Sequence, residues 1–278
     1  MPNPNNPLGL DLDTMYEPTD VEEQVFDLLA AYLPAHSKIT PQKAAKKAHS
    51  FFPHHCLGED DDYYPRQFLC EFWEVMFRIA PQLEYQGKPM QRYISLHKAL
   101  QELPEIFIQG RYRVWQDRPY FGMELHERWS QMGSGTKVTD PAHRSWRNMN
   151  GLLIHFHNEG ISDGAYHALT CIWRHLEDDD RHRNTRTKYI NVYPPVAALW
   201  FIHCSPRLYE ACRNQEYRDR IPGGRLWKGE AGYNIPRWGF WRSRFEELKR
   251  SHLATEETIR ACKAALNGMD AVSKPVDS

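Results

Sequence analysis

The most distinctive chemical groups of the sequence lie in a glycine-rich segment, residues 222–233, which reads PGGRLWKGEAGY. Its four glycines permit left-handed turns and a close approach of a ligand to the backbone. Arg225 and Lys228 are candidate anion anchors, and Trp227 lies between them as a candidate aromatic wall. A structural interpretation is also open, in which the segment folds back and clamps the helix that follows it, and we favour that interpretation.

A candidate active site combines this segment with two helices expected around Trp146 and Trp200. Imidazole groups transfer protons and amides hold a substrate in place, so three polar side chains are the candidate catalytic residues: His203, His155 and Asn148. The candidate substrate-binding residues carry guanidinium, ammonium or indole groups: Arg113, Trp115, Trp200, Arg225, Trp227 and Lys228. His203 follows a buried apolar run, so it also fits a hydrogen-bonded histidine of the core.

Side chains that bind transition metals recur along a helix expected over residues 163–177. They are spaced four, four and three residues apart and so share one face: His167, Cys171, His175 and Asp178. A metal would need a further ligand, His155 or His157, from the preceding helix. A polar helix face with one half-buried cysteine explains the same pattern, and we predict no metal site.

The acidic run at residues 177–180 loosely resembles the aspartate-rich motif of helical terpene cyclases, which holds magnesium. The second motif of that family should lie C-terminal to the first. The nearest match, formed by Asn158, Ser162 and Tyr166, precedes it and ends in tyrosine. A solvated turn in which acids and arginines neutralise each other is the better interpretation. The glycine pattern lacks the lysine of a Walker motif, and no motif identifies a cofactor.

Composition excludes several classes of protein. Lys and Arg total 35 and Asp and Glu total 36, so the chain of 278 residues lacks the basic field of a nucleic-acid-binding protein. No apolar run approaches the ~18 residues of a membrane span. Six cysteines without a C-x-x-C pair or a secretory signal favour a reduced, cytoplasmic protein. The 9 Trp, 14 Tyr and 12 Phe can fill a large core and line a pocket.

Helix signals position these residues. Thr19 with Glu22 predicts a capping box, and Pro41 and Pro141 each predict a first helical position. Apolar residues at spacings of three and four predict a core helix over residues 65–77. We also expect helices over the following ranges: 91–103, 122–132, 141–159, 163–177, 194 onward, 236–250 and 255–267. Only residues 111–115 resemble a strand, so the fold class is all-α.

The same signals predict one domain. We expect a multi-helix array over residues 20–268, with the glycine-rich loop packed near the C-terminal helices. The N-terminal residues 1–19 and the C-terminal residues 269–278 are expected to be disordered, with Gly268 as the last helix stop. A flexible break at residues 133–139 is the best candidate for a domain boundary, but short helix connections favour one contiguous array.

The C-terminal half resembles a known family. The run GGRLWKG at residues 223–229 and the run RWGFW at residues 237–241 resemble the signature of a filamentous-fungal helical family catalogued only as a domain of unknown function. Further pieces match it in order, and the resemblance covers roughly residues 25–265: Arg113–Trp115, Pro119–Gly122, Trp146–Asn150, Ala197–Ile202 and Arg207–Glu210. It implies a helical fold and a fungal source, and some members are associated with secondary-metabolite gene clusters. It transfers no catalytic residue.

Three functions are consistent with these observations. The first is an accessory protein of fungal secondary metabolism that binds or converts a small molecule in a pocket. The second is a non-catalytic interaction or regulatory protein. The third is an aminoacyl-tRNA-dependent transferase that forms cyclic dipeptides. The acidic motif of such enzymes is a pair of aspartates followed two residues later by glutamate. Neither Asp61-Asp62 nor Asp179-Asp180 is followed by that glutamate. The sequence determines neither the substrate nor the oligomeric state.

Overall fold

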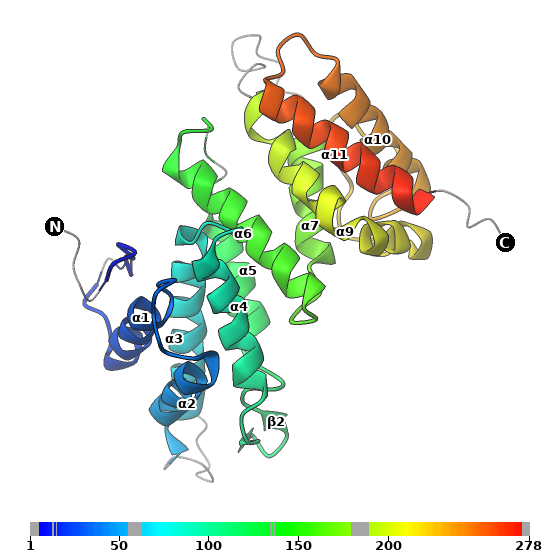
Figure 1. Cartoon of the computed structure of the whole chain (residues 1–278). Helices are drawn as coiled ribbons and strands as arrows, with labels where there is room; N and C mark the ends of the chain where they lie inside the picture. The colour runs from blue at the N-terminus through cyan, green and yellow to red at the C-terminus, as the bar shows by residue number, and fades with distance from the viewer. Residues whose placement is uncertain are drawn as a thin grey trace. The chain divides into compact units, whose positions relative to one another are not determined.

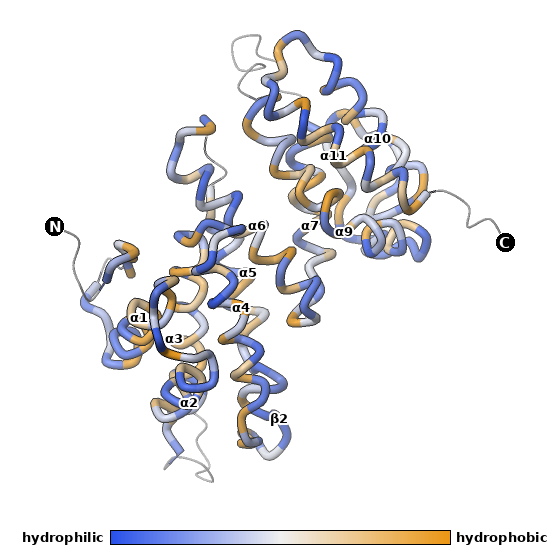
Figure 2. Tube along the Cα trace, viewed as in Figure 1, coloured by the Kyte–Doolittle hydropathy of each residue, from blue (hydrophilic) through white to orange (hydrophobic). Residues whose placement is uncertain are grey.

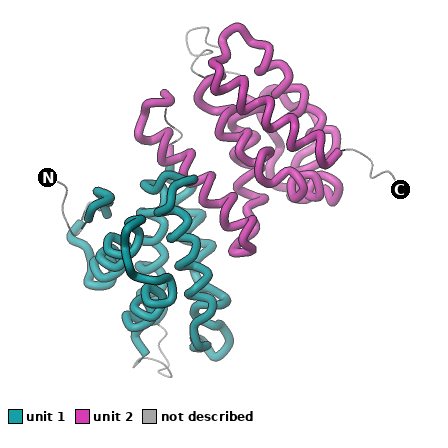
Figure 3. Tube along the Cα trace, viewed as in Figure 1, with its two compact units in different colours: residues 1–132 teal, residues 133–278 magenta. Residues whose placement is uncertain are grey.

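A computed structural model describes residues 6–12, 14, 16–54, 63–133, 135, 137–178 and 189–273. The described residues are predominantly α-helical, with one short antiparallel hairpin (Figure 1), so the all-α prediction is confirmed. The helices group into two compact units, residues 1–132 and 133–278 (Figure 3). The boundary falls at the start of the flexible break expected at residues 133–139.

The N-terminal unit contains five helices among its described residues. They are α1 (Asp20–Tyr32), α2 (Pro41–Phe51), α3 (Tyr63–Ile79), α4 (Lys88–Gln101) and α5 (Phe121–Gln131). The short 3-10 helix η2 (Ala80–Gln82) follows α3, and the hairpin of β1 (Phe107–Ile108) and β2 (Tyr112–Arg113) precedes α5. The predicted capping box is present, because Thr19 accepts from the backbone of Glu22 and Glu22 accepts from the backbone of Thr19.

Aromatic rings fill the core of the N-terminal unit. Trp73 stacks on His97 and meets Phe121 edge to face, and its indole N–H donates to the carbonyl of Pro119 at 3.0 Å. His97 is buried among these rings. Burial and the nearby Arg118 lower the pKa of His97 to about 3, so the folded unit holds this imidazole neutral.

The C-terminal unit is built around the long helix α9 (Pro194–Asn214), against which α6 (Pro141–Asn158), α7 (Ala165–Ile172), α10 (Ile235–Lys249) and α11 (Glu256–Ser273) all pack. A one-turn π-helix, η3 (Trp173–Glu177), continues α7. Hydrophobic and hydrophilic positions alternate along the helices of the unit, as an amphipathic array requires (Figure 2). Pro206 lies inside α9, and the backbone leaves helical geometry at Cys204, so the helix kinks there.

Three boundaries differ from the sequence predictions. Helix α11 continues to Ser273, past Gly268, because Met269 is buried in the unit and extends the apolar face. The segment at residues 6–12 is also attached: Leu10 is buried, and the backbone of Asp11 exchanges two hydrogen bonds with the side chain of Gln82. The helix expected over residues 163–177 ends as a π-helix, which periodicity alone does not reveal.

In the ranges that the structure describes, none of the helices combines the length and the apolar character needed to cross a bilayer.

Candidate functional site

A buried ion pair organises the centre of the C-terminal unit. The carboxylate of Glu177, at the end of η3, accepts two hydrogen bonds from Arg237 of α10, at 2.7 and 2.8 Å. Both side chains have no exposed surface. Such a pair is tolerated only when the remaining donors and acceptors are also satisfied.

Further bonds complete this pair. The same carboxylate accepts from the indole N–H of Trp241 at 2.6 Å and from the backbone N–H of Gly224 at 2.9 Å. Arg237 donates its remaining hydrogen bonds to the carbonyls of Ile221 and Gly232. The ion pair therefore ties η3, the glycine-rich segment and α10 together at one point.

Two glycines allow the segment to come this close. An ideal Cβ atom on Gly224 would lie 2.6 Å from the backbone carbonyl of Glu177, so a side chain there would collide with η3. Gly232 has a φ of +70°, and a Cβ atom there would lie 2.5 Å from the backbone of Arg218. These contacts match the interpretation in which the segment folds back and clamps neighbouring helices.

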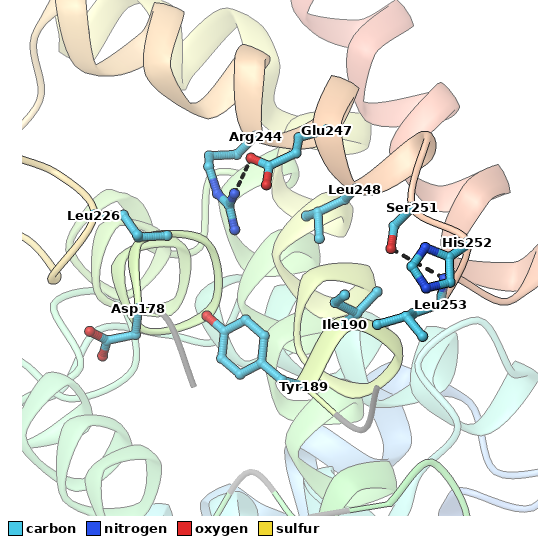
Figure 4. A pocket seen from close by; sticks show the side chains of 10 residues that line it. All are labelled: Asp178, Tyr189, Ile190, Leu226, Arg244, Glu247, Leu248, Ser251, His252 and Leu253. Atoms are coloured by element: carbon cyan, nitrogen blue, oxygen red, sulfur yellow. Dashed lines mark hydrogen bonds and ion pairs between the residues drawn. The ribbon is translucent and has the colours of Figure 1, made fainter. Parts of the chain in front are cut away.

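A pocket of about 320 Å³ opens beside this ion pair (Figure 4). Its lining combines charged, polar and apolar side chains from the end of η3, the glycine-rich segment, the short helical stretch at residues 189–192, the C-terminal half of α10 and the turn at residues 251–253. The lining residues are Asp178, Tyr189, Ile190, Leu226, Arg244, Glu247, Leu248, Ser251, His252 and Leu253.

The walls of the pocket are fixed by the carbonyl groups at the end of η3, which lack partners within the helix. The hydroxyl of Tyr189 donates to the carbonyl of His175 at 3.1 Å. Arg244 donates from Nε to the carbonyl of Leu176 at 3.1 Å, and the backbone N–H of Leu226 donates to the carbonyl of Glu177 at 2.8 Å. Three lining residues therefore also serve as the cap of η3, which holds their side chains in place.

The matched family covers this ion pair and part of the pocket. The model of the family described as "Protein of unknown function (DUF3632)" matches residues 73–245. The chain belongs to this family. No curated protein and no solved structure matches the chain. The DUF3632 region includes Glu177, Arg237 and Arg244 and ends before Glu247 and His252, which complete the pocket.

Within the DUF3632 region, the candidate residues Trp200 and Asn148 lie in the core of the C-terminal unit. Trp200 is buried and donates from its indole N–H to the amide oxygen of Asn150 at 3.0 Å. Asn148 is buried on α6. The prediction that these side chains face a substrate finds no support in the lining of the pocket, which contains neither of them.

His155 and His203 do come together, on α6 and α9. Partial desolvation and the nearby imidazole of His155 both lower the pKa of His203. His155 is half-buried and His203 is exposed at the surface, and neither lines the pocket. The structure therefore pairs these two candidates but separates them from the pocket described above.

The candidates from the glycine-rich segment lie beside the pocket rather than in it. Arg225 and Lys228 are exposed, and the backbone N–H of Arg225 donates to the carboxylate of Asp178 at 3.3 Å. Trp227 is half-buried, packs on Phe240 and donates to the carbonyl of Glu230 at 2.8 Å. Only Leu226, the neighbour of Arg225 and Trp227, reaches the lining.

Arg113 and Trp115 belong to the N-terminal unit, and each has local partners there. Arg113 forms ion pairs with Glu105 and Asp117 on the surface of the hairpin. Trp115 is buried against Phe72 and donates from its indole N–H to Nδ1 of His49 at 2.9 Å. Trp115 is thus a residue of the core, because its large ring fills space there.

Two residues of the candidate metal-ligand face, Cys171 and His175, are buried, whereas His167 and Asp178 are half-buried. Sγ of Cys171 lies 3.3 Å from Nδ1 of His175, and both side chains are buried. Burial raises the pKa of the Cys171 thiol and lowers that of His175 to about 3, so both groups are neutral. Among the described residues, no three His, Cys, Asp or Glu side chains are arranged to hold a metal ion.

From the sequence, Glu177 is placed only in an acidic run expected to be a solvated turn, and Tyr189, His252 and Arg244 are not among the candidate residues. One signal could have found part of the site. Positions 237, 241, 244 and 248 are spaced four, three and four residues apart, so they share one face of the predicted helix. Two arginines on a face that also carries Trp241 and Leu248 indicate buried acidic or carbonyl partners. Two aspartate pairs considered from the sequence, Asp61-Asp62 and Asp179-Asp180, lie outside the described residues.

Proposed function

We propose that the protein binds a small molecule in the pocket of its C-terminal unit and that it serves fungal secondary metabolism as an accessory protein. The observation that carries the proposal is the pocket itself. Its volume of about 320 Å³ falls within the range of small-molecule sites, and its lining mixes apolar walls with a few charged groups.

The two hydroxyl groups among the described lining residues of the pocket already have structural roles, so neither is a free nucleophile. The hydroxyl of Tyr189 donates to the carbonyl of His175, and the hydroxyl of Ser251 accepts from the backbone N–H of Leu253. Conversion of the ligand would therefore depend on another lining group, such as His252, acting as a base, and binding needs no such step. The secondary-metabolite role rests on the family resemblance, and the pocket supports its small-molecule part.

A pocket-filling variant tests this proposal in cells. Leu226 is half-buried on the wall of the pocket, and Leu226→Trp would place an indole ring inside it. A strain without the gene should lose one compound and accumulate a precursor in an untargeted metabolite comparison. Reintroducing the wild-type gene should restore the compound, and reintroducing the Leu226→Trp gene should not.

Ile235→Trp is the matched control, because Ile235 is 44% exposed and lies outside the pocket. It should restore the compound as well as the wild type does. If Leu226→Trp lowers the melting temperature, Leu253→Trp fills the same pocket from another wall. An unchanged metabolite profile in the deleted strain would contradict the proposal, and the silencing of a whole pathway would favour the regulatory alternative.

A further inference from the structure

We propose that the ligand of this pocket is a monocarboxylate with an apolar body and that Arg244 binds its carboxylate group. This inference rests on the proposed function, since it names the class of molecule that the same pocket takes. Its evidence comes from the environment of one guanidinium group and of the carboxylate beside it.

The guanidinium group of Arg244 is held in place, but not all of its hydrogen-bond donors are engaged. Its side chain is only 15% exposed, and the bond from Nε to the carbonyl of Leu176 fixes the plane of the guanidinium group. Nη1 pairs with the carboxylate of Glu247. In the ranges that the structure describes, Nη2 has no hydrogen-bond partner, and Figure 4 shows the guanidinium group directed toward the centre of the pocket, on the side of Tyr189. A fixed, mostly desolvated guanidinium group with a free nitrogen favours an anion.

Glu247 shows which anion fits. Its carboxylate already binds Arg244 from the rim of the pocket, three residues further along α10. The Glu247 side chain is 61% exposed, so water can replace Arg244 as its partner when it turns outward. Because the Glu247 side of this ion pair stands in water, a ligand carboxylate can replace Glu247 without leaving a buried charge unpaired. The carboxylate of Glu247 therefore occupies the position on Arg244 that the carboxylate of a ligand would take.

The other charges of the pocket favour a monoanion over a phosphate. Asp178 and Glu247 both line the pocket, and among the lining residues that the structure describes Arg244 is the single guanidinium group. A dianionic phosphate would meet two carboxylates and one permanent cation, whereas a carboxylate needs only one positive partner. Charge complementarity therefore points to one negative charge on the ligand.

Apolar side chains define the body of the ligand. Ile190 and Leu248 are almost fully buried and form the floor of the pocket, and Leu226 and Leu253 are half-buried at its sides. These four residues surround the position that a chain or ring attached to the carboxylate would occupy (Figure 4). Burial of that body supplies affinity, and Arg244 supplies orientation.

Binding of two matched probes to the purified full chain tests the proposal. The probes are 4-phenylbutyrate and its uncharged analogue 4-phenylbutyramide, titrated by ligand-observed NMR. We expect the wild type to bind the carboxylate more tightly than the amide. Arg244→Met should weaken binding of the carboxylate about tenfold or more, the loss expected for a charge-assisted hydrogen bond, and should leave binding of the amide unchanged.

Two further variants of α10 sharpen the test. Glu247→Gln removes the competing carboxylate and should strengthen binding of 4-phenylbutyrate. Arg242→Met removes a positive charge from the same helix outside the pocket, where Arg242 pairs with Asp270 on the surface, and should change neither affinity. A loss of the same size in Arg242→Met would show that the effect is general electrostatics and would overturn the assignment of Arg244.

Three other results would overturn the inference: equal affinity of the wild type for both probes, undiminished carboxylate binding in Arg244→Met, or tighter binding of phenyl phosphate than of 4-phenylbutyrate. Each of these leaves the pocket occupied, so the proposed function survives while the carboxylate assignment fails. The absence of binding by both probes overturns the carboxylate assignment as well. Failure of the proposed function is measured separately, by the metabolite comparison with Leu226→Trp.

Discussion

Replacing Arg237 with methionine should lower the free energy of unfolding of the C-terminal unit by about 3–5 kcal/mol, because the variant leaves the carboxylate of Glu177 buried without a cation. Methionine matches the length of the aliphatic part of arginine, so the loss reflects charge and hydrogen bonds more than packing. Urea-induced unfolding, followed by tryptophan fluorescence, measures this loss.

Arg242→Met provides the matched control for this prediction. Arg242 lies on the same helix and pairs with Asp270, but both side chains are more than 40% exposed, so its removal should cost less than about 1 kcal/mol. Glu177→Gln keeps an acceptor for Trp241 and removes the negative charge. The double variant Glu177→Gln/Arg237→Met should lose less stability than the sum of the two single losses. Additive losses, or an Arg237→Met loss as small as that of Arg242→Met, would show that the ion pair does not organise the unit.

Acid should destabilise the protein because both units bury a neutral histidine. Burial, with Arg174 and His143 nearby, lowers the pKa of His175 to about 3, whereas an unfolded chain protonates histidine near pH 6.5. The unfolded state therefore binds the proton first as the pH falls. The stability that the neutral imidazole contributes is complete above pH 6.5 and is lost at about 1.4 kcal/mol per pH unit down to pH 3.

The variants His175→Phe and His97→Phe test this pH dependence. Phenylalanine keeps the ring contacts of His175 with Tyr193 and of His97 with Trp73, and it cannot take up a proton. Urea titrations from pH 7 to pH 4 should show that each variant loses less stability over this range than the wild type, by about 3 kcal/mol at pH 4. Wild-type and variant curves that run parallel would mean that these histidines do not set the acid sensitivity.

Local sequence signals predicted much of the fold. The capping box at Thr19, the prolines that begin α2 and α6, and the apolar spacing of α3 each depend on residues a few positions apart. The short hairpin also falls where residues 111–115 resemble a strand. Such features are readable because capping and helical periodicity are properties of a single segment.

The site was less predictable because its contacts join distant segments. Glu177 and Arg237 are 60 residues apart, and nothing near Glu177 in the sequence marks it as buried. Cys171 and His175 are buried although periodicity placed them on a polar face, because α7 and η3 are covered by neighbouring elements on more than one side. Tryptophans chosen as pocket walls, such as Trp115 and Trp200, fill the cores of their units, because large rings bury the most apolar surface.

Capture of small molecules from a cell extract tests the central claim, that the pocket beside the Glu177–Arg237 pair binds a metabolite. The purified chain is incubated with a small-molecule extract of the producing organism, separated from unbound compounds by gel filtration, denatured and examined by mass spectrometry. The wild type and Ile235→Trp should retain at least one compound that Leu226→Trp does not. A wild-type sample that retains nothing above a protein-free control, or a Leu226→Trp sample that retains the same compound equally well, would contradict the claim.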